Sequence, residues 1–165
     1  AVDINPQVIA VARSLFELPF EGENFEIVEA DGAEYIKVFR HNTDVILVDG
    51  FDGEQIIDAL VEEPFFQDCR HALSPDVTNW WSGDKRYQRF VERLLNVFEG
   101  RVLELPAESH GNMAVMAFQS SPKEQSLDKL KKRAEKLSGQ YGLDFKRMLN
   151  DLKANNPNNG KHFYL

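Results

Sequence analysis

Apolar positions along the chain follow two alternating spacings, which predict helices and strands in turn. Five apolar residues after Pro6 recur at helical spacing and predict a helix that ends at Leu18-Pro19: Val8, Ile9, Ala12, Leu15 and Phe16. Asn5 is a suitable N-cap for this helix, and Pro6 suits its first position. The residues before Asn5 read as the last part of a strand.

The same spacings predict the remaining elements. Helices are expected over residues 33–39, 58–73 and 84–98, and strands over 25–28, 44–48, 77–81, 101–105 and 113–118. The 58–73 helix has Leu60, Phe65, Phe66, Cys69 and Leu73 as its expected buried side. Alternating helices and strands predict an α/β fold with a mostly parallel sheet and helices on both faces. The short connection over 106–112 favours an antiparallel hairpin at the sheet's edge.

From residue 121 onward the composition shifts to Lys, Glu and Asp. Two amphipathic helices are expected at about 127–138 and 144–154, followed by a polar tail. The domain organisation predicted from this shift is a sheet domain over residues 1–120 and a C-terminal helical extension over 121–165.

The run from Asp44 to Val48 is the most informative stretch. A continuous apolar run bounded by Gly is typical of a strand buried on both faces in the middle of a parallel sheet. Asp49 and Asp52 follow it, with Gly50 and Gly53 beside them. Ligands of open α/β sheets bind at the carboxyl ends of strands, so Asp49 is a candidate for chemistry. Asp and Gly also dominate turns, so a purely structural role for both acids stays open.

The net charge and the cysteine content argue against several classes of function. The formal net charge of −8 and the pI of about 5.0 argue against broad binding to nucleic acid or anionic membranes. The single cysteine, Cys69, excludes an internal disulfide and a multi-cysteine metal site, and it favours a cytoplasmic location. The four histidines lack ligand spacing, so no metal site is expected. No apolar run approaches 18 residues, so no span across a membrane is expected.

In two places the sequence differs from the pattern expected of a complete nucleotide-binding sheet. Such a sheet starts with a strand and a Gly-rich turn, and no G-x-G-x-x-G is present. Between the helix at 58–73 and the helix at 84–98, only residues 77–81 are available for a strand. One hypothesis covers both: the sequence belongs to a longer chain and lacks segments of it.

Three segments carry a family resemblance: residues 2–8 (VDINPQV), 29–35 (EADGAEY) and 45–52 (VILVDGFD). With these acids placed on strand ends, the chain resembles the spermidine synthase (polyamine aminopropyltransferase) family. That family shares the Rossmann-like fold of S-adenosylmethionine-dependent methyltransferases. The likeness extends over about residues 1–119 and is strongest in the first 75.

The resemblance implies roles for six residues. It makes Asp49 and Asp52 catalytic, and it forms the nucleoside site from Asp3, Ile4, Asp31, Gly32 and Asp49. Asp3 would accept hydrogen bonds from the ribose hydroxyls, and Asp31 would accept one from the adenine amino group. Asp49 would hold the attacking amine and help remove its proton, while Asp52 would add a second negative charge for the polyamine. As structural alternatives, Asp3 could cap the helix at Pro6 and Asp31 could be a turn residue.

The expected activity is aminopropyl transfer from decarboxylated S-adenosylmethionine to a diamine such as putrescine, with no tightly bound cofactor. The sequence departs from the family in having Gly53-Glu54 where Pro usually follows the second acid, and in lacking the N-terminal β-hairpin portion. Two alternatives remain: an S-adenosylmethionine-dependent methyltransferase of the same fold, and a non-catalytic nucleoside-binding relative. The expected partners are a nucleoside and a polyamine, without nucleic acid or membrane, and a homodimer stays open.

Overall fold

The computed structural model describes the chain except residues 41–42, 51–56, 74–76, 83–85, 108–111 and 123–125, and for residues 77–82 it describes the strand without the side chains. The strands are β1 (Val2–Asp3), β2 (Val28–Glu29), β3 (Ile46–Val48), β4 (Val77–Ser82), β5 (Val102–Pro106) and β6 (Met113–Phe118). The helices are α1 (Pro6–Leu15), α2 (Gly32–Tyr35), α3 (Glu63–Ala72), α4 (Tyr87–Val97), α5 (Leu127–Tyr141) and α6 (Phe145–Asn155). Two short 3₁₀ helices complete the described elements, η1 (Ile36–Val38) and η2 (Asp58–Leu60).

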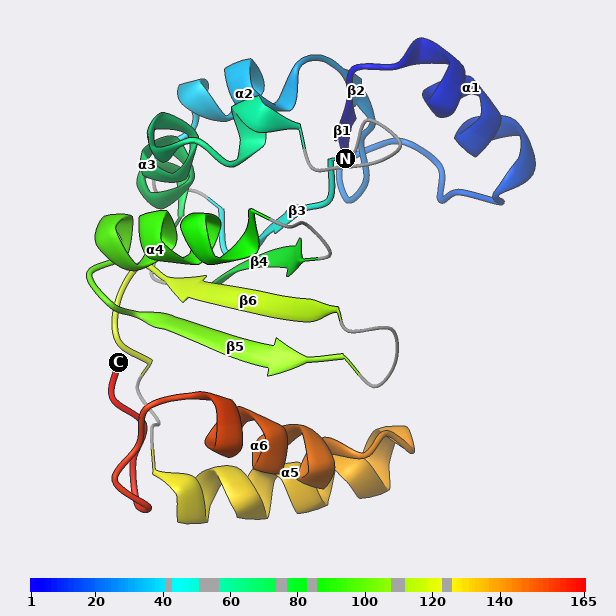
Figure 1. The fold of residues 1–165 in the computed structure, drawn as a ribbon. Helices are drawn as coiled ribbons and strands as arrows, with labels where there is room; N and C mark the ends of the chain where they lie inside the picture. The colour runs from blue at the N-terminus through cyan, green and yellow to red at the C-terminus, as the bar shows by residue number, and fades with distance from the viewer. Residues whose placement is uncertain (41–42, 51–56, 74–76, 83–85, 108–111, 123–125) are drawn as a thin grey trace.

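The strands form two sheets in the described part of the chain. β1 and β2 pair in parallel, and a four-stranded sheet has the order β3-β4-β6-β5. β3 is parallel to β4, whereas β6 is antiparallel to both β4 and β5. Figure 1 shows the β5–β6 hairpin at the lower edge of this sheet. The predicted α/β architecture and its antiparallel edge hairpin are therefore confirmed.

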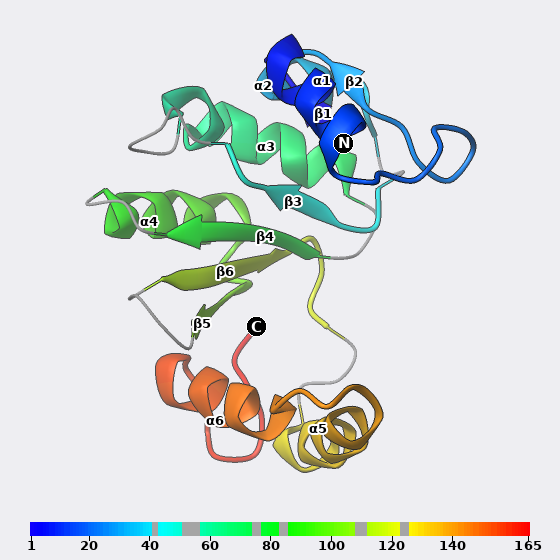
Figure 2. The ribbon, with the colours of Figure 1, turned by 90° about the vertical axis from the view of Figure 1, so that its right-hand side faces the viewer.

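Two hydrophobic clusters cover opposite faces of the β5–β6 hairpin. Val102 and Val115 belong to the larger cluster, which α3 and α4 complete, while Leu103 and Met116 belong to the cluster under α5 and α6. Neighbouring residues of a strand point to opposite faces, so this division places helices on both sides of the hairpin, as predicted. Figure 2 shows α3 and α4 beside one another and α5 with α6 at the far end.

Asn156 ties the C-terminal helices to the open edge of β5. Its side-chain oxygen accepts a hydrogen bond from the Glu104 N–H at 2.7 Å, and its amide nitrogen donates to the Glu104 carbonyl at 2.7 Å. The same nitrogen donates to the Leu152 carbonyl at 2.7 Å, and Asn156 is buried. One side chain thus supplies to β5 the two backbone hydrogen bonds that a neighbouring strand would supply.

We expect Asn156→Ala to lower the free energy of unfolding by about 2 kcal/mol, because it leaves two partly buried backbone groups of Glu104 without their partners. Asn150→Ala, at an exposed position of α6, is the matched control and should change it by less than about 0.5 kcal/mol. Urea unfolding of both variants measures the difference. Equal stabilities would show that Asn156 does not secure the edge of β5.

Cys69 lies fully buried in the larger cluster. Burial in apolar surroundings, with the nearby charge of Asp68 adding to it, raises the pKa of the Cys69 thiol from 9.0 to about 12. Because the thiolate is the reactive form, we expect alkylation at pH 8 to be about a thousandfold slower in the folded protein than in urea. Mass spectrometry after timed iodoacetamide treatment checks this. Similar rates in both states would contradict the buried, unreactive thiol that the sequence predicts.

Several predicted elements differ from the structure at their ends, and two of them show a local cause. The strand expected at 25–28 is β2, Val28–Glu29, because Gly22 and Phe25 instead form an isolated antiparallel bridge. The helix expected over 58–73 is divided into η2 and α3, with Pro64 in the first turn of α3. Proline is suited to a first helical turn and not to a helix interior, which explains the division.

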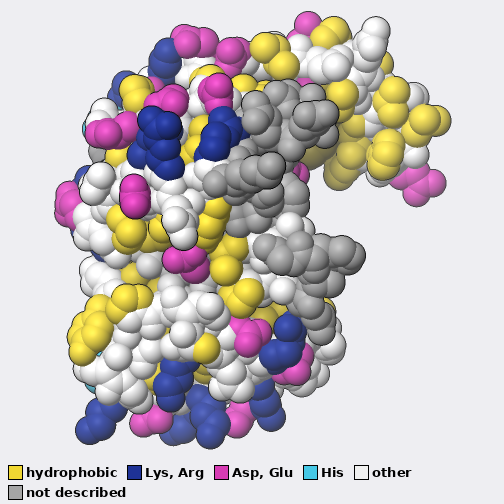
Figure 3. All heavy atoms as spheres, viewed as in Figure 1, with side chains coloured by type: hydrophobic (Ala, Val, Ile, Leu, Met, Phe, Trp, Pro, Cys, Tyr) yellow, Lys and Arg dark blue, Asp and Glu magenta, His cyan; other side chains and the backbone are white. Residues whose placement is uncertain are grey.

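The prediction that residues 44–48 form a strand buried on both faces is wrong for the structure described. β3 covers only Ile46–Val48, lies at one end of the four-stranded sheet, and leaves Leu47 72% exposed. The apolar face predicted for α1 is likewise uncovered except at Ile9, which is buried, and Ala12, which is half-buried. Leu15, Phe16 and the following Phe20 are exposed. Figure 3 shows apolar side chains gathered on the projecting part that carries α1. The apolar pattern predicts that these side chains of β3 and α1 are buried, but the described residues do not cover them.

The short interval between α3 and α4 does contain a strand. β4 runs over Val77–Ser82 and pairs with both β3 and β6. This interval therefore accommodates a central strand without additional residues. The side chains of Trp80 and Trp81, considered as pocket or core residues, lie outside the described residues.

Candidate active site at the strand ends

Asp3 and Asp31 follow neighbouring parallel strands. Asp3 is the last residue of β1 and pairs with Glu29, the last residue of β2. The Asp3 carbonyl also accepts a hydrogen bond from the Ala30 N–H at 3.1 Å. Because β1 and β2 are parallel, both carboxyl ends point to the same edge, and Asp31 begins the turn into α2 there. The structure thus places two predicted ligand residues on adjacent strand ends.

Each of these two carboxylates uses one oxygen to hold its own turn. Asp3 Oδ1 accepts from the Asn5 N–H at 2.7 Å, and Asp31 Oδ1 accepts from the Ala33 N–H at 2.8 Å. The N-cap of α1 is Asn5, as predicted, and not Asp3, whereas Asp31 is the N-cap of α2. A capping role fixes the carboxylate and leaves its second oxygen for a ligand, so the structural and ligand roles are compatible.

Asp49 directly follows β3 and is exposed. Among the described residues, none forms a hydrogen bond or ion pair with its carboxylate. α2 packs against both β1 and η2, and Leu60 of η2 lies against Gly50, the residue after Asp49. These contacts connect the ends of β1 and β3 through α2 and η2. The second predicted catalytic acid, Asp52, lies outside the described residues.

Ile4 and Gly32 flank these carboxylates. Ile4 is exposed beside Asp3, so its side chain is accessible to a ligand. Gly32 is the first residue of α2, and a Cβ built on it meets no atom within 4 Å. The described residues therefore leave open space next to both acids. A flat adenine ring needs such space, and the apolar Ile4 side chain suits contact with it.

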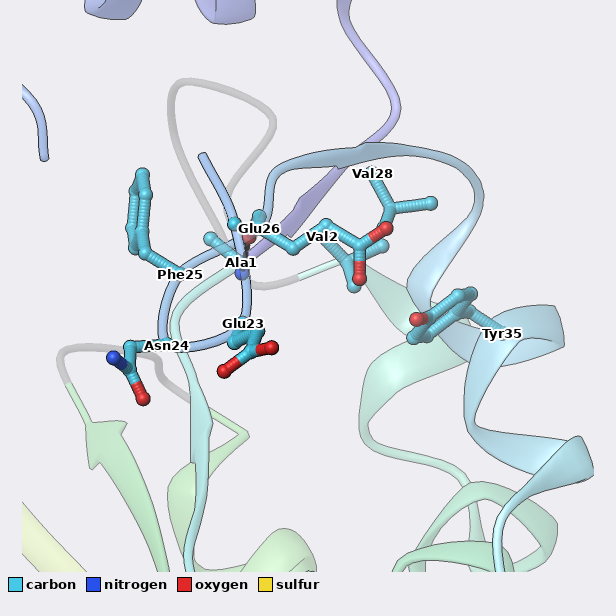
Figure 4. A pocket seen from close by; sticks show the side chains of 9 residues that line it. Ala1, Val2, Glu23, Asn24, Phe25, Glu26, Val28 and Tyr35 are labelled. Atoms are coloured by element: carbon cyan, nitrogen blue, oxygen red, sulfur yellow. Dashed lines mark hydrogen bonds between the residues drawn. The ribbon is translucent and has the colours of Figure 1, made fainter. Parts of the chain in front are cut away.

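A hollow of about 300 Å³ lies at the other end of β1 and β2. Its lining includes Val2, Glu23, Asn24, Glu26, Val28 and Tyr35, and it contains none of Asp3, Asp31 and Asp49. Figure 4 shows the loop side chains on one side of it and Tyr35 on the other. The predicted carboxylates therefore do not line this hollow. Glu23 and Glu26 of its lining belong to a local run of acids, Glu21, Glu23 and Glu26, which is the sequence signal that could have indicated this hollow.

The described part of the chain also lacks signs of a metal site and of a membrane-spanning helix. No group of three or more His, Cys, Asp or Glu there has the arrangement of a metal site. None of the helices described combines the length and the hydropathy needed to cross a bilayer.

Comparison with known proteins identifies the relatives of this chain. The spermine/spermidine synthase domain matches residues 1–81. A polyamine aminopropyltransferase of Neisseria meningitidis serogroup A is 86% identical over 168 positions, which include all of this chain and 64% of the relative. Over its whole length this chain is similar to proteins of the spermidine synthase family. The family match includes each of the three segments on which the resemblance rests.

A second polyamine aminopropyltransferase, from Chromobacterium violaceum, is 64% identical over the same extent. The chain spans 64% of the length of these relatives. The alignments have 168 positions, three more than this chain has residues, so the relatives contain at least three residues without a counterpart here.

Solved structures confirm the fold predicted for this chain. A probable spermidine synthase from Corynebacterium glutamicum matches with a TM-score of 0.66 at 19% identity, covering 84% of this chain and 53% of that one. Human methyltransferase-like protein 13 matches with a TM-score of 0.70 at 21% identity, covering 91% and 70%. At these identities the likeness establishes the Rossmann-like, methyltransferase-type fold alone.

Proposed function

We propose that the protein is an aminopropyltransferase that uses decarboxylated S-adenosylmethionine and a diamine such as putrescine. The observation that carries this proposal is the 86% identity, over the whole chain, to a polyamine aminopropyltransferase. The solved structures do not favour the methyltransferase alternative, because their likeness concerns only the fold. The high identity to a named transferase also argues against a non-catalytic relative.

The strand-end carboxylates support specific roles in this reaction. Asp3 would accept hydrogen bonds from the ribose hydroxyls and Asp31 from the adenine amino group, each through the oxygen not used in its turn. Ile4 and Gly32 would border the nucleoside. The sulfonium makes methylthioadenosine a good leaving group, so the protein's contribution is mainly orientation and electrostatics.

Asp49 would act on the attacking amine. A protonated amine has no lone pair, so a positioned carboxylate that accepts its proton makes it a nucleophile. The amine nitrogen then bonds to the aminopropyl carbon while the carbon–sulfur bond breaks, and its electron pair stays on sulfur. The products are the aminopropylated amine and neutral methylthioadenosine. Asp52 would supply a second negative charge for the polyamine cation.

The proposed reaction uses decarboxylated S-adenosylmethionine as a co-substrate and takes no tightly bound cofactor. The single buried cysteine needs no oxidising compartment, so we place the reaction in the cytoplasm. The exposed apolar side chains of α1 are compatible with a homodimer.

An assay of the intact protein with putrescine and either decarboxylated or ordinary S-adenosylmethionine tests the proposal. We expect spermidine and methylthioadenosine in equal amounts from the decarboxylated substrate only. Calorimetry should show tighter binding of methylthioadenosine than of S-adenosylhomocysteine. A methylated product with S-adenosylhomocysteine would instead identify a methyltransferase, and the absence of product and of nucleoside binding would refute both activities.

A further inference from the structure

η2 lies directly against the end of β3 that carries Asp49. A Cβ added to Gly50 would be 2.2 Å from Leu60 Cδ1, which is closer than any real contact between carbon atoms. The Ile57 N–H also donates a hydrogen bond to the Gly50 carbonyl at 3.2 Å. The lack of a side chain at Gly50 therefore lets Leu60 Cδ1, the far end of a flexible side chain, approach the end of β3 closely, and the Gly50 carbonyl contacts Ile57, the N-cap residue of η2.

Two arginines of the α4 region hold η2 and the residues after it. Arg86 pairs with Asp58, the first residue of η2. Arg93 donates to the Val61 carbonyl at 2.7 Å and pairs with Glu62 at 3.0 Å, with its side chain only 16% exposed. The two arginines are two helical turns apart and therefore project from one side of α4. Both ends of the segment 58–62 are thus attached to the same helix.

Leu60 lies between these two attachments. It packs against the larger hydrophobic cluster, and the adjacent Val61 is buried in that cluster. A side chain held in this way has little freedom to move away from Gly50. Exposed ion pairs contribute modestly. Arg93 is less exposed than Arg86, at 16% against 30%, and it also donates to the Val61 carbonyl, so it is expected to hold the segment more firmly.

We infer that η2 positions Asp49 for the reaction, with Leu60 as the residue that sets the end of β3. This inference rests on the proposed function of Asp49. A carboxylate that must reach the attacking amine has to lie within about 0.5 Å of its productive position. Asp49 directly precedes Gly50, so the backbone that Gly50 and Leu60 define together contributes to its place. Leu60, Arg86 and Arg93 are positioning residues and do not contact substrate.

The test is a double-variant cycle at Gly50 and Leu60 in the intact protein. We expect Gly50→Ala to lower kcat at least about tenfold, because it forces Leu60 and the end of β3 apart. Leu60→Ala should lower kcat by about threefold to tenfold. The double variant should have a higher kcat than Gly50→Ala alone, since the new methyl group fills space that Leu60 has left. The Kd of methylthioadenosine should change less than about threefold in all three.

Arg86→Ala extends the test to the first attachment, with exposed Arg89→Ala on the same helix as its matched control. We expect kcat to fall severalfold in the Arg86 variant only, and the swapped pair Asp58→Arg with Arg86→Asp to recover part of it. Measuring the thermal midpoint of every variant separates misplacement of Asp49 from loss of folding.

Additive losses at Gly50 and Leu60, or losses of kcat that simply follow the thermal midpoint, would overturn the positioning role. Failure of the proposed function gives a different result. In that case the wild-type protein forms no methylthioadenosine, which refutes both the proposed function and the positioning role of η2. If the wild type is active and Asp49→Asn is inactive, the proposed function stands. Additive effects of Gly50→Ala and Leu60→Ala would then refute only the positioning role of η2.

Discussion

Asp49→Asn is expected to lower kcat for aminopropyl transfer by about a thousandfold while the Kd of methylthioadenosine stays within about threefold. The amide has nearly the shape of the carboxylate, but it cannot accept the proton of the attacking amine or balance its charge. The nucleoside is held mainly through Asp3 and Asp31 in the proposed site, so its affinity should not follow kcat. Steady-state kinetics and calorimetry on the same samples measure the two effects.

The pH dependence of this variant provides a second readout. Without a base, reaction requires the fraction of diamine that is already unprotonated in solution, and amines of this type have pKa values of about 10. The rate of Asp49→Asn should therefore rise with pH, roughly tenfold per unit between pH 7 and pH 9. The wild-type rate should rise less steeply over this range.

Asp44→Asn is the matched control, because Asp44 is exposed and precedes the same strand at its other end. We expect its kcat to stay within about twofold of wild type. An Asp49→Asn variant with more than a tenth of wild-type activity would eliminate Asp49 as the residue that removes the amine's proton. A parallel loss in Asp44→Asn would indicate a general effect of charge.

Much of the fold follows from local patterns in the sequence. Asn5 and Pro6 fix the start of α1, and the apolar spacing of Phe65, Phe66 and Cys69 marks the buried side of α3. The hairpin β5–β6 was predictable because its two runs flank a short connection. In each case the determining interactions lie within a few residues or on one face of one element.

Other features could not be predicted, because they depend on partners distant in the sequence. Asn156 reads as part of a polar tail, yet it is buried against Glu104, whose position only the tertiary fold defines. The contact of Leu60 with Gly50 likewise depends on how η2 folds back. Leu47 fails in the other direction. Its apolar run is typical of a buried strand, but Leu47 is exposed because the described residues do not cover it.

The residues of the candidate site stay predictions from the family motifs, and their geometry could not be predicted from the sequence. Family motifs mark Asp3, Asp31 and Asp49, and topology alone puts each of them at a strand end. The pairing of β1 with β2 then brings Asp3 and Asp31 to one edge. The dual use of Asp31 as helix cap and candidate ligand illustrates why a sequence could not decide between its two roles.

Phe66→Ala is expected to have the largest effect on stability, a loss of about 3–5 kcal/mol in the free energy of unfolding. Phe66 is among the largest fully buried side chains, and it lies in the cluster that joins α3, α4 and the four-stranded sheet. Truncation removes its apolar contacts and leaves a cavity that these packed elements cannot fill by small shifts. Urea unfolding followed by circular dichroism measures the change, with the slope m expected to stay constant.

Phe20→Ala is the matched control, because Phe20 is 100% exposed and its truncation should change the free energy by less than about 0.5 kcal/mol. Since the expected loss approaches the whole stability of many domains, Phe66→Leu serves as a milder variant, with an expected loss of about 1–2 kcal/mol. A loss below 1 kcal/mol in Phe66→Ala, or equal losses at positions 66 and 20, would mean that the larger cluster is not the main source of stability. Because η2 and Leu60 pack on this cluster, a loosened core should also lower kcat in Phe66→Leu, which connects the stability of α3 to the position of Asp49.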